Sequence, residues 1–472
     1  MAKTLFFYDL ETSGLNARED RIMQFAGRRT NRDLTPIGKP YNMFVALSDD
    51  TLPNPDALMV TGITPQKTVD EGYSEAQFAR ILNDEIFTPD TIVVGFNNVR
   101  FDDEFIRHLL WRNFYDPYEW CWKDGRSRWD MLDVVRMTRA LRSEGISWPL
   151  DDAGEPTNRL ELITRENDIA HKNAHDAMSD VDALIDVTKL IRDKQPQLFE
   201  YLLKMRDKKE VVKLVNVDNK KPFVYSSGRY DKEFAKTTAA FPLSAGRNGN
   251  VVVYDLRYDP TLFIDLSESE LAHKVYASWQ ERQAEDFVKL PAKELQPNRC
   301  PAVAPLGVLA HGGGWAKISL DAETIAKHQK ILLAHPEFAE KLRTIFENKP
   351  EFTRSPDPEA QLYDGFLNDR DRLRAEAVRN ASERELADFH PNFADERLPG
   401  LLLHYKARNF PKTLSSDERE MWQTWRAARI QAQLPKYMAA LQRFAASALD
   451  PGKEFIVQEL QLWAESILPE PD

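Results

Sequence analysis

An apolar stretch close to the N-terminus, Leu5-Phe6-Phe7-Tyr8-Asp9-Leu10-Glu11-Thr12, ends in two carboxylates. Its aromatic and branched side chains predict a β-strand over residues 4–10. Because side chains alternate along a strand, Asp9 and Glu11 point to the same side at its end. The two negative charges repel each other, which favours a divalent cation between them, and oxygen ligands suit Mg²⁺ or Mn²⁺. The alternative is a plain strand end, at which Asp9 opens a turn and Glu11 is solvated.

Around this strand, residues 1–198 alternate β-branched or aromatic runs with helical patterns, which predicts an α/β layer. We expect strands at 4–10, 22–29, 41–45 and 91–96. We expect helices at 74–87, 102–113, 131–141 and 176–191.

The pattern changes after this layer. Short strands separated by Gly, Asn and Lys turns predict a β-rich domain over 201–354, with strands at 211–217, 222–225 and 250–254 and a helical stretch near 320–347. The sequence Ser355-Pro356-Asp357-Pro358 neither continues a helix nor pairs in a sheet, so it predicts a linker. A charged, helical domain is expected over 359–472.

Composition limits the class of protein. The chain has 472 residues, about three times the usual length of one domain. Hydrophobic residues make up 42% and charged residues 29%, which excludes a disordered chain and a membrane channel. No apolar run approaches the ~18 residues that cross a bilayer, so we expect neither a membrane span nor a signal peptide. Cys121 and Cys300 lack disulfide or metal-site spacing, and the expected location is therefore the reducing cytoplasm.

Positive charge is concentrated in one segment of an acidic protein. The net charge is −12 overall, whereas residues 201–258 hold twelve Lys or Arg and six Asp or Glu, a net charge of +6. This distribution suits a protein that holds a phosphate backbone in one place and gathers carboxylates for metal elsewhere. A solvated Lys-rich loop around 204–213 is the alternative, and charge alone does not decide between the two.

A second acidic motif, Phe101-Asp102-Asp103-Glu104, follows the predicted strand at 91–96. Asp102 lies where a helix begins, so it is either a metal ligand or a capping and dipole partner of that helix. Asp103 and Glu104 compete with it for any metal role.

A third motif, Asn173-Ala174-His175-Asp176-Ala177-Met178-Ser179-Asp180, opens the last predicted helix of the layer. A spacing of five residues would separate His175 and Asp180 by ~140° on a continuous helix. His175 is therefore expected in the loop before the helix, with Asp180 in its early turns. The alternatives are a solvated histidine and a simple N-cap at Asp176.

The order of these motifs resembles the DEDD exonuclease superfamily, in its histidine-containing branch. Further stretches, spread over nearly the whole chain, are similar to bacterial exonuclease I: Asp9-Leu10-Glu11-Thr12-Ser13-Gly14, Thr61-Gly62-Ile63-Thr64-Pro65, Asn97-Asn98-Val99-Arg100-Phe101-Asp102, Arg112-Asn113-Phe114-Tyr115-Asp116-Pro117-Tyr118, Asn173-Ala174-His175-Asp176-Ala177, Ala360-Gln361-Leu362-Tyr363-Asp364-Gly365-Phe366 and Tyr405-Lys406-Ala407-Arg408-Asn409-Phe410-Pro411. One departure is Leu10, where that family has an aromatic residue; its side chain is expected to point away from the carboxylates.

The resemblance implies an α/β RNase H-like exonuclease domain (1–198), an SH3-like β-rich domain (201–354) and a C-terminal α-helical domain (359–472). It implies a processive exodeoxyribonuclease that hydrolyses single-stranded DNA 3′ to 5′ to 5′-mononucleotides in DNA repair and recombination. Two Mg²⁺ ions, for which Mn²⁺ can substitute, are implied as cofactors. Their implied ligands are Asp9, Glu11, Asp102 and Asp180. His175 becomes the general base, and an unperturbed histidine pKa of about 6.5 suits that role near neutral pH.

A basic and aromatic stretch between Arg107 and Trp148 holds half of the ten tryptophans. Bases stack on aromatic faces and arginines bind phosphates, so this stretch is expected to hold the DNA strand. Substrate contacts are predicted for Glu11, Arg107, Tyr118, Trp122 and Arg136 and, by resemblance, for Arg159. Some of the aromatic residues pack in the core instead, and Trp111 and Trp129 are the ones expected there.

The resemblance also implies a partner, the single-stranded DNA-binding protein, whose acidic C-terminal tail would dock on a basic, partly apolar pocket. Arg142 is one candidate for it, and the sequence does not locate the pocket. A monomer is expected. Two other functions stay open: an RNA exonuclease, although such relatives are much shorter, and a non-catalytic DNA-binding scaffold, which would not need the complete acidic set. A proofreading subunit would leave two domains unexplained.

Overall fold

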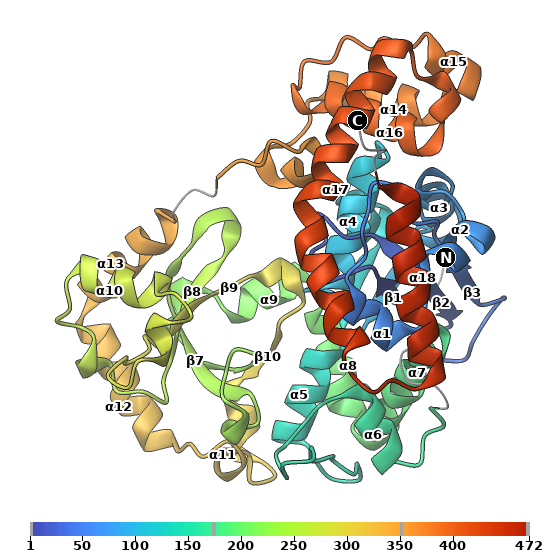
Figure 1. The fold of residues 1–472 in the computed structure, drawn as a ribbon. Coiled ribbons are helices and arrows are strands. Elements are labelled where there is room, and N and C mark those ends of the chain that lie inside the picture. The colour runs from blue at the N-terminus through green and yellow to red at the C-terminus, as the bar shows by residue number, and fades with distance from the viewer. Residues whose placement is uncertain (1–2, 172–175, 350–352, 469–472) are drawn as a thin grey trace. The chain divides into compact units, whose positions relative to one another are not determined.

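The structure, a computed structural model, describes residues 3–171, 176–349 and 353–468. It divides into two compact units, each of which combines segments that are distant in sequence. The first consists of Met1–Ser127, His171–Leu184 and Thr353–Asp472, and the second of Arg128–Ala170 and Ile185–Phe352. Figure 1 shows the path of the chain with its elements labelled.

The first unit is built on a sheet with the strand order β3-β2-β1-β4. Its strands are β1 (Thr4–Thr12), β2 (Ile22–Thr30), β3 (Tyr41–Phe44) and β4 (Thr91–Gly95). β1 pairs antiparallel with β2 and parallel with β4, so it has a neighbour on each side. The four strands predicted for this layer are confirmed to within two residues at each end.

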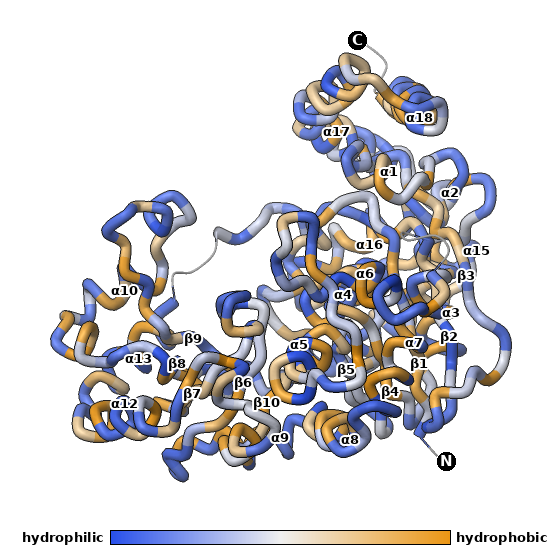
Figure 2. Tube along the Cα trace, turned by 90° about the horizontal axis from the view of Figure 1, so that it is seen from below, coloured by the Kyte–Doolittle hydropathy of each residue, from blue (hydrophilic) through white to orange (hydrophobic). Residues whose placement is uncertain are grey.

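Helices cover this sheet and bury its apolar side chains. The N-terminal ones are α1 (Pro55–Thr61), α2 (Pro65–Glu71), α3 (Glu75–Ile81) and α4 (Asp102–Arg112), and α7 (Ala177–Lys194) begins in the same unit. The helix predicted at 74–87 is divided, because a π-helical turn, η1 (Leu82–Ile86), continues α3. Phe6 and Val93 of the sheet pack with Phe78 of α3 and Phe105 of α4 in one core. Figure 2 shows hydrophobic residues, in orange, along β1 and β4 and on the helices beside them.

The C-terminal part of the first unit is helical, as predicted. It consists of the 3-10 helix η11 (Pro358–Asp364) followed by α14 (Asp369–Asn380), α15 (Glu383–Ala387), α16 (Arg397–Asn409), α17 (Ser416–Ala445) and α18 (Pro451–Ile467). α17 and α18 lie side by side and both contact α1 (Figure 1). Leu398 and Tyr405 of α16 share a core with Trp111 of α4. The stretch 355–358, predicted as a linker, leads directly into η11, whose Glu359 is fully buried.

The second unit contains a five-stranded antiparallel sheet in the order β10-β6-β7-β8-β9. The strands are β6 (Phe223–Ser226), β7 (Thr237–Ala245), β8 (Val251–Asp255), β9 (Ala292–Leu295) and β10 (Ala302–Pro305). The unit also contains β5 (Ser127–Asp130), which begins on the last residue of the first unit, and α5 (Met131–Leu141), α6 (Leu160–Glu166), α8 (Pro196–Met205), α9 (Lys208–Leu214), α10 (Glu268–Tyr276), α11 (Gly314–Lys317), α12 (Ala322–Ala334) and α13 (Pro336–Glu347). The β-rich character expected of this region is confirmed.

The strand predicted at 211–217 is wrong, because α9 occupies most of that stretch. Val211 and Val215 are both buried and lie four residues apart, which is helical spacing. Asp207 caps the helix by accepting a hydrogen bond from the backbone amide of Lys209. β7 was not predicted, since its Thr237-Thr238-Ala239-Ala240 start is only weakly apolar. Within the described ranges, no helix combines the length and the apolar character needed to span a membrane.

Candidate active site

Three of the predicted metal-binding acids meet at the end of β1. Asp9 and Glu11 lie on the strand itself, and Asp180 lies in the first turn of α7. One carboxylate oxygen from each residue falls within 4.8 Å of the other two. This arrangement follows from local structure, because strand alternation directs Asp9 and Glu11 to one side and the helix start brings in the third acid.

Asp102 is the first residue of α4 and is 5% exposed. Its charge is the largest electrostatic cause of a raised pKa at Asp9, second only to burial. It also raises the pKa of Glu11, after burial and Asp180. Asp102 therefore belongs to the same electrostatic cluster as the three acids that lie together.

The four acids form a site whose negative charge is concentrated. Burial, then Asp102, Glu11 and Asp180, raise the pKa of Asp9 well above its ordinary value. Burial and the neighbouring carboxylates raise the pKa of Glu11 to about 8. Every charged group among these main causes is a carboxylate, so each ionised acid makes the ionisation of the next more costly. A set of hard oxygen donors with excess negative charge fits a divalent cation such as Mg²⁺ or Mn²⁺.

The structure separates Asp102 from the two acids that compete with it in the sequence. Asp103 is fully buried and accepts hydrogen bonds from Tyr8 Oη at 2.6 Å and Asn98 Nδ2 at 3.1 Å. Glu104 pairs with Arg107 at 2.9 Å. Asp103 therefore links the start of α4 to β1 through a hydrogen bond, and Glu104 forms an ion pair that orients Arg107.

His175, the predicted general base, lies outside the described residues. Another histidine, His171, places Nε2 2.6 Å from Asp180 Oδ1. The side chain of His171 is 5% exposed. Sequence reasoning missed this contact, because no periodic pattern in the sequence connects His171 with Asp180.

Four of the predicted DNA-contacting residues belong to the first unit: Glu11, described above, and Arg107, Tyr118 and Trp122. The guanidinium of Arg107 lies 5.5 Å from the ring centroid of Tyr118. Trp122 is 63% exposed, so its ring is accessible to a ligand.

The two tryptophans expected in the core are confirmed there, since Trp111 is 3% and Trp129 2% exposed.

Arg136 and Arg159 belong to the second unit. Arg136 on α5 pairs with Asp133 at 2.6 Å. A Cβ at Gly228 would lie 3.0 Å from the Arg136 guanidinium, so the missing side chain leaves room for this arginine. Arg159 precedes α6, its side chain is 62% exposed, and it pairs with Glu161 at 2.5 Å.

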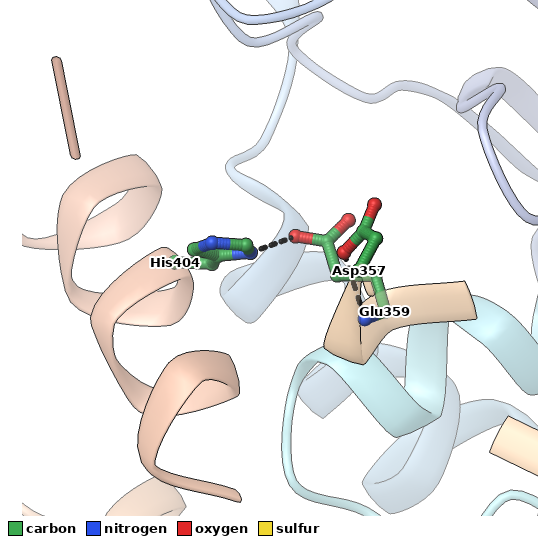
Figure 3. Close-up of side chains that lie close together, drawn as sticks. All are labelled: Asp357, Glu359 and His404. Atoms are coloured by element: carbon green, nitrogen blue, oxygen red, sulfur yellow. Dashed lines mark hydrogen bonds and ion pairs between the residues drawn. The ribbon is translucent and has the colours of Figure 1, made fainter. Parts of the chain in front are cut away.

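A second cluster of possible ligands lies elsewhere in the first unit, between η11 and α16. Asp357, Glu359 and His404 place ligand atoms within 4.8 Å of one another, and Figure 3 shows His404 directed at Glu359. His404 Nδ1 lies 2.8 Å from Glu359 Oε1. Unlike the site on β1, this cluster already contains cations: Arg21 binds Glu359 at 2.8 Å, and Arg408 also pairs with it.

The arginines decide the electrostatics of this second cluster. Burial alone would raise the pKa of Glu359, but Arg408 and Arg21 outweigh burial and hold it well below its ordinary value. The same holds for Asp50, which is fully buried and accepts two hydrogen bonds from Arg408, at 3.1 and 2.8 Å. Glu359 and Asp50 are therefore stably ionised and charge-balanced, and we interpret this cluster as a structural ion network that joins the N-terminal and C-terminal segments of the unit.

Comparisons with known proteins agree along the chain. Residues 6–188 match the family model described as "Exonuclease", residues 206–348 match "Exonuclease I SH3-like domain", and residues 356–467 match "Exonuclease I C-terminal domain". The fold class predicted from the sequence, an exonuclease domain followed by an SH3-like and a C-terminal helical domain, is thereby confirmed.

Individual relatives are similar over nearly their full length. The exodeoxyribonuclease I of Haemophilus influenzae is 38% identical over 93% of this chain and 93% of its own. A crystal structure of E. coli exonuclease I in complex with a dA16 oligonucleotide has a TM-score of 0.93 at 36% identity, over 99% of this chain and 100% of that one. A structure described as SSB/exonuclease I in complex with an inhibitor has a TM-score of 0.89 at 35% identity, also over 99% and 100%.

Proposed function

The chain belongs to the exonuclease I family, and from this premise we propose that it hydrolyses single-stranded DNA from the 3′ end to 5′-mononucleotides. We further propose that it does so processively, in DNA repair and recombination, as a cytoplasmic monomer. Its domains are proposed to span 1–198, 201–354 and 359–472. The relatives named exodeoxyribonuclease I and the relative solved with an oligonucleotide support the substrate class.

One observation carries the catalytic part of the proposal: Asp9, Glu11 and Asp180 converge, with Asp102 in electrostatic contact, and the pKa values of Asp9 and Glu11 are raised. We propose Asp9, Glu11, Asp102 and Asp180 as ligands of two Mg²⁺ ions, for which Mn²⁺ can substitute. When bound there, the ions supply the positive charge that stabilises the attacking and leaving oxygens of phosphodiester hydrolysis. The chain's own contribution is to hold four carboxylates, from β1, α4 and α7, in one electrostatic cluster.

The proposed general base is His175, which accepts a proton from the attacking water. Asp180, five residues later in the sequence, lies in the first turn of α7. His171 is a second histidine near this acid, because it contacts Asp180 at 2.6 Å. Its contact with a proposed metal ligand favours a positioning role for His171.

Single substitutions separate the two histidines. His175→Ala is expected to lower kcat by about 10²- to 10⁴-fold and to remove the acidic limb of the pH–rate profile. His171→Ala is expected to raise the Mg²⁺ concentration needed for half-maximal activity and to leave the acidic limb of the pH–rate profile in place. The opposite pattern, with the limb lost only in His171→Ala, would assign the base to His171.

The polarity of digestion is tested with single strands labelled at one end. A 3′ label is expected to appear in mononucleotides at once, whereas a 5′ label appears only when the strand is nearly consumed. Immediate release of a 5′ label would reverse the proposed polarity. Duplex DNA and RNA of the same sequence complete the test, because rapid hydrolysis of the RNA would favour an RNA exonuclease.

Substrate contacts are proposed for Glu11, Arg107, Tyr118, Trp122, Arg136 and Arg159. The exposure of Trp122 and Arg159 and the contact between Arg107 and Tyr118 support this set. A non-catalytic scaffold would bind single-stranded DNA through these residues but release no nucleotides in Mg²⁺, so nucleotide release distinguishes the two functions.

We also propose docking with the single-stranded DNA-binding protein through its acidic C-terminal tail, supported by the relative solved as SSB/exonuclease I. In the second unit, Arg142 Nη2 donates to the Val308 carbonyl at 3.5 Å, which directs a guanidinium toward the loop around Gly312. Arg142→Glu is expected to weaken binding of a tail peptide, and added salt to weaken the wild-type complex. Unchanged peptide affinity in Arg142→Glu would move the docking pocket elsewhere.

A further inference from the structure

Two consecutive acids, Asp102 and Asp103, open α4, and only the first of them belongs to the proposed metal site. The residue before them, Phe101, occupies the N-cap position and gives the helix no capping hydrogen bond from its side chain. A cap of that kind normally fixes how a helix begins. The position of the Asp102 carboxylate therefore depends on other contacts of the helix start.

The side chain of Asp103 supplies such a contact by attaching the helix start to β1. Tyr8 Oη donates to Asp103 Oδ1 at 2.6 Å, and Asn98 Nδ2 donates to the same oxygen at 3.1 Å. The backbone amide of Asp103 also donates to the Asn98 carbonyl at 2.9 Å. Tyr8 is 1% exposed and Asp103 is fully buried. Because water does not compete at this depth, the hydrogen bond between them is strong and keeps one geometry.

Tyr8 in turn stands on a firmly held part of the sheet. It is paired in register with Gly27 of β2, and β1 also pairs with β4 on its other side. The ring of Tyr8 stacks on Phe25 with centroids 6.0 Å apart, in the core that also contains Phe105 of α4. The hydroxyl group that receives the helix start is therefore a fixed reference point.

The order of residues on the two elements gives this hydrogen bond its consequence. Tyr8 directly precedes Asp9 on β1, and Asp102 directly precedes Asp103 on α4. Strand alternation directs Tyr8 and Asp9 to opposite faces of the sheet. A hydrogen bond on the Tyr8 face therefore sets how close the helix start comes to β1, and with it the separation of Asp9 and Asp102. Partners outside the ligand set orient metal ligands in this way.

We propose that Tyr8 is a positioning residue of the metal site: its hydrogen bond to Asp103 holds Asp102 at the distance from Asp9 that binds the divalent cations. This inference rests on the proposed function and deepens it. Tyr8 acts through Asp103 and contacts neither the cations nor the DNA strand. It contributes to metal affinity and to the chemical step, and not to the affinity for DNA.

The test compares Tyr8→Phe with the control Tyr437→Phe. Both substitutions keep a buried aromatic ring and remove one hydrogen bond, since Tyr437 Oη donates to the Leu460 carbonyl at 2.7 Å. Tyr437 joins α17 to α18, neither of which carries an acid of the proposed site. The control therefore shows what the loss of a buried hydrogen bond does by itself.

Metal affinity is measured without DNA and without turnover, by titrating each protein with Mn²⁺ and following the electron paramagnetic resonance signal of the free ion. Tyr8→Phe is expected to raise the Kd for Mn²⁺ by about 10- to 100-fold, whereas Tyr437→Phe binds Mn²⁺ like the wild type. In Mg²⁺, Tyr8→Phe is expected to raise the concentration needed for half-maximal activity and to lower kcat. Its KM for single-stranded DNA and its binding of the strand in EDTA are expected to be unchanged.

A double-mutant cycle tests whether Tyr8 acts through Asp103. If it does, Tyr8→Phe has no further effect on the Kd for Mn²⁺ in a protein that already carries Asp103→Ala. Additive effects would overturn the proposed route. If Asp103→Ala does not fold, Tyr8→Phe and its control decide the question alone.

Two results would overturn the positioning role and leave the proposed function standing. One is a Tyr8→Phe protein with the Mn²⁺ affinity and the Mg²⁺ requirement of the wild type. The other is an equal loss of Mn²⁺ affinity in Tyr8→Phe and Tyr437→Phe, which would show a general effect of lowered stability. A wild type that binds no Mn²⁺ and releases no nucleotides from single strands would overturn the proposed function itself.

Discussion

The two clusters of possible metal ligands in the first unit have similar geometry and opposite electrostatics. In each, three possible ligands place atoms within 4.8 Å of one another. At Asp9 and Glu11 the charged neighbours are carboxylates, and both pKa values are raised. At Glu359, Arg408 and Arg21 overcome the effect of burial and lower the pKa.

The difference shows that proximity of ligands does not identify a metal site. A cluster whose negative charge is already balanced by buried arginines gains little from a cation, whereas a cluster of carboxylates alone is stabilised by one. Asp357 is intermediate, since burial and Glu359 raise its pKa while Arg429, at 3.4 Å, lowers it. Charge balance, more than distance, is the reason why we propose catalysis for the cluster on β1 and interpret the cluster between η11 and α16 as structural.

The largest expected effect is the loss of activity when an acid of the first cluster is removed. Asp9→Ala is expected to lower Mg²⁺-dependent nucleotide release by ~10³-fold or more, because several kcal/mol of charge stabilisation disappear with the ligand set. Binding of single-stranded DNA in EDTA is expected to stay close to the wild type. The matched control is Asp70→Ala, an exposed acid at the end of α2. Retained cleavage by Asp9→Ala would remove Asp9 from the catalytic site.

The second prediction concerns stability: removing an acid of the second cluster is expected to destabilise the protein and to leave its activity unchanged. Glu359→Gln is expected to lower the free energy of unfolding by about 3–5 kcal/mol, because Arg21 and Arg408 then share a buried environment with less compensating charge. Chemical denaturation measures the loss. Nucleotide release per folded molecule is expected to be unchanged. A folded Glu359→Gln with normal stability and no Mg²⁺-dependent activity would instead mark the second cluster as the metal site.

The third prediction uses pH to separate the clusters. Since the pKa of Glu11 is raised from 4.5 to about 8 in the folded protein, the folded state keeps a proton that the unfolded state has lost in this window. In EDTA the free energy of unfolding is therefore expected to fall as pH rises from about 4.5 to 8, by on the order of a few kcal/mol. Saturating Mg²⁺ is expected to flatten this dependence.

The pKa values of Glu359 and Asp50 are lowered, so their contribution to the pH dependence of the free energy of unfolding has the opposite sign. It is present at neutral pH and is lost only as pH falls below the ordinary range of a carboxyl group.

Asp9→Asn is the control for the pH experiment, since it removes one of the repelling charges. It is expected to reduce the loss of stability in EDTA between about pH 4.5 and 8. An unchanged pH dependence in Asp9→Asn would contradict the electrostatic coupling of Asp9 and Glu11.

Local patterns predicted parts of the first cluster, whereas the combination of Asp9, Glu11, Asp102 and Asp180 in one site was predicted only through the resemblance to the exonuclease family. Strand alternation directs Asp9 and Glu11 to one side, and a carboxylate at the start of a helix is visible as Asp102 and Asp180. The strands around them were predictable to within two residues for the same reason. Strand and helix patterns repeat after a few residues, so they can be recognised in the sequence itself.

The second cluster was not predictable, because its parts are distant in the chain. Arg21 and Glu359 are 338 residues apart, and no periodic pattern connects them. The segment before Glu359 instead suggested a linker, since Pro356 and Pro358 exclude regular structure but do not reveal that the next residue is buried among arginines. The strand wrongly predicted over α9 has a related cause, because short runs of valine are compatible with either element.

The smallest expected effect tests whether burial, and not ion pairing as such, makes the second cluster stabilising. Arg28 on β2 and Asp182 on α7 form a pair at 3.2 Å, but their side chains are 26% and 45% exposed. Asp182→Asn is expected to lower the free energy of unfolding by only about 0.2–1 kcal/mol, and added salt is expected to reduce that difference further because solvent ions screen exposed charges. The loss in Glu359→Gln is expected to persist in the same salt series, since Glu359 is fully buried. Equal losses in the two variants would mean that pairing alone, without burial, accounts for the cohesion of the network.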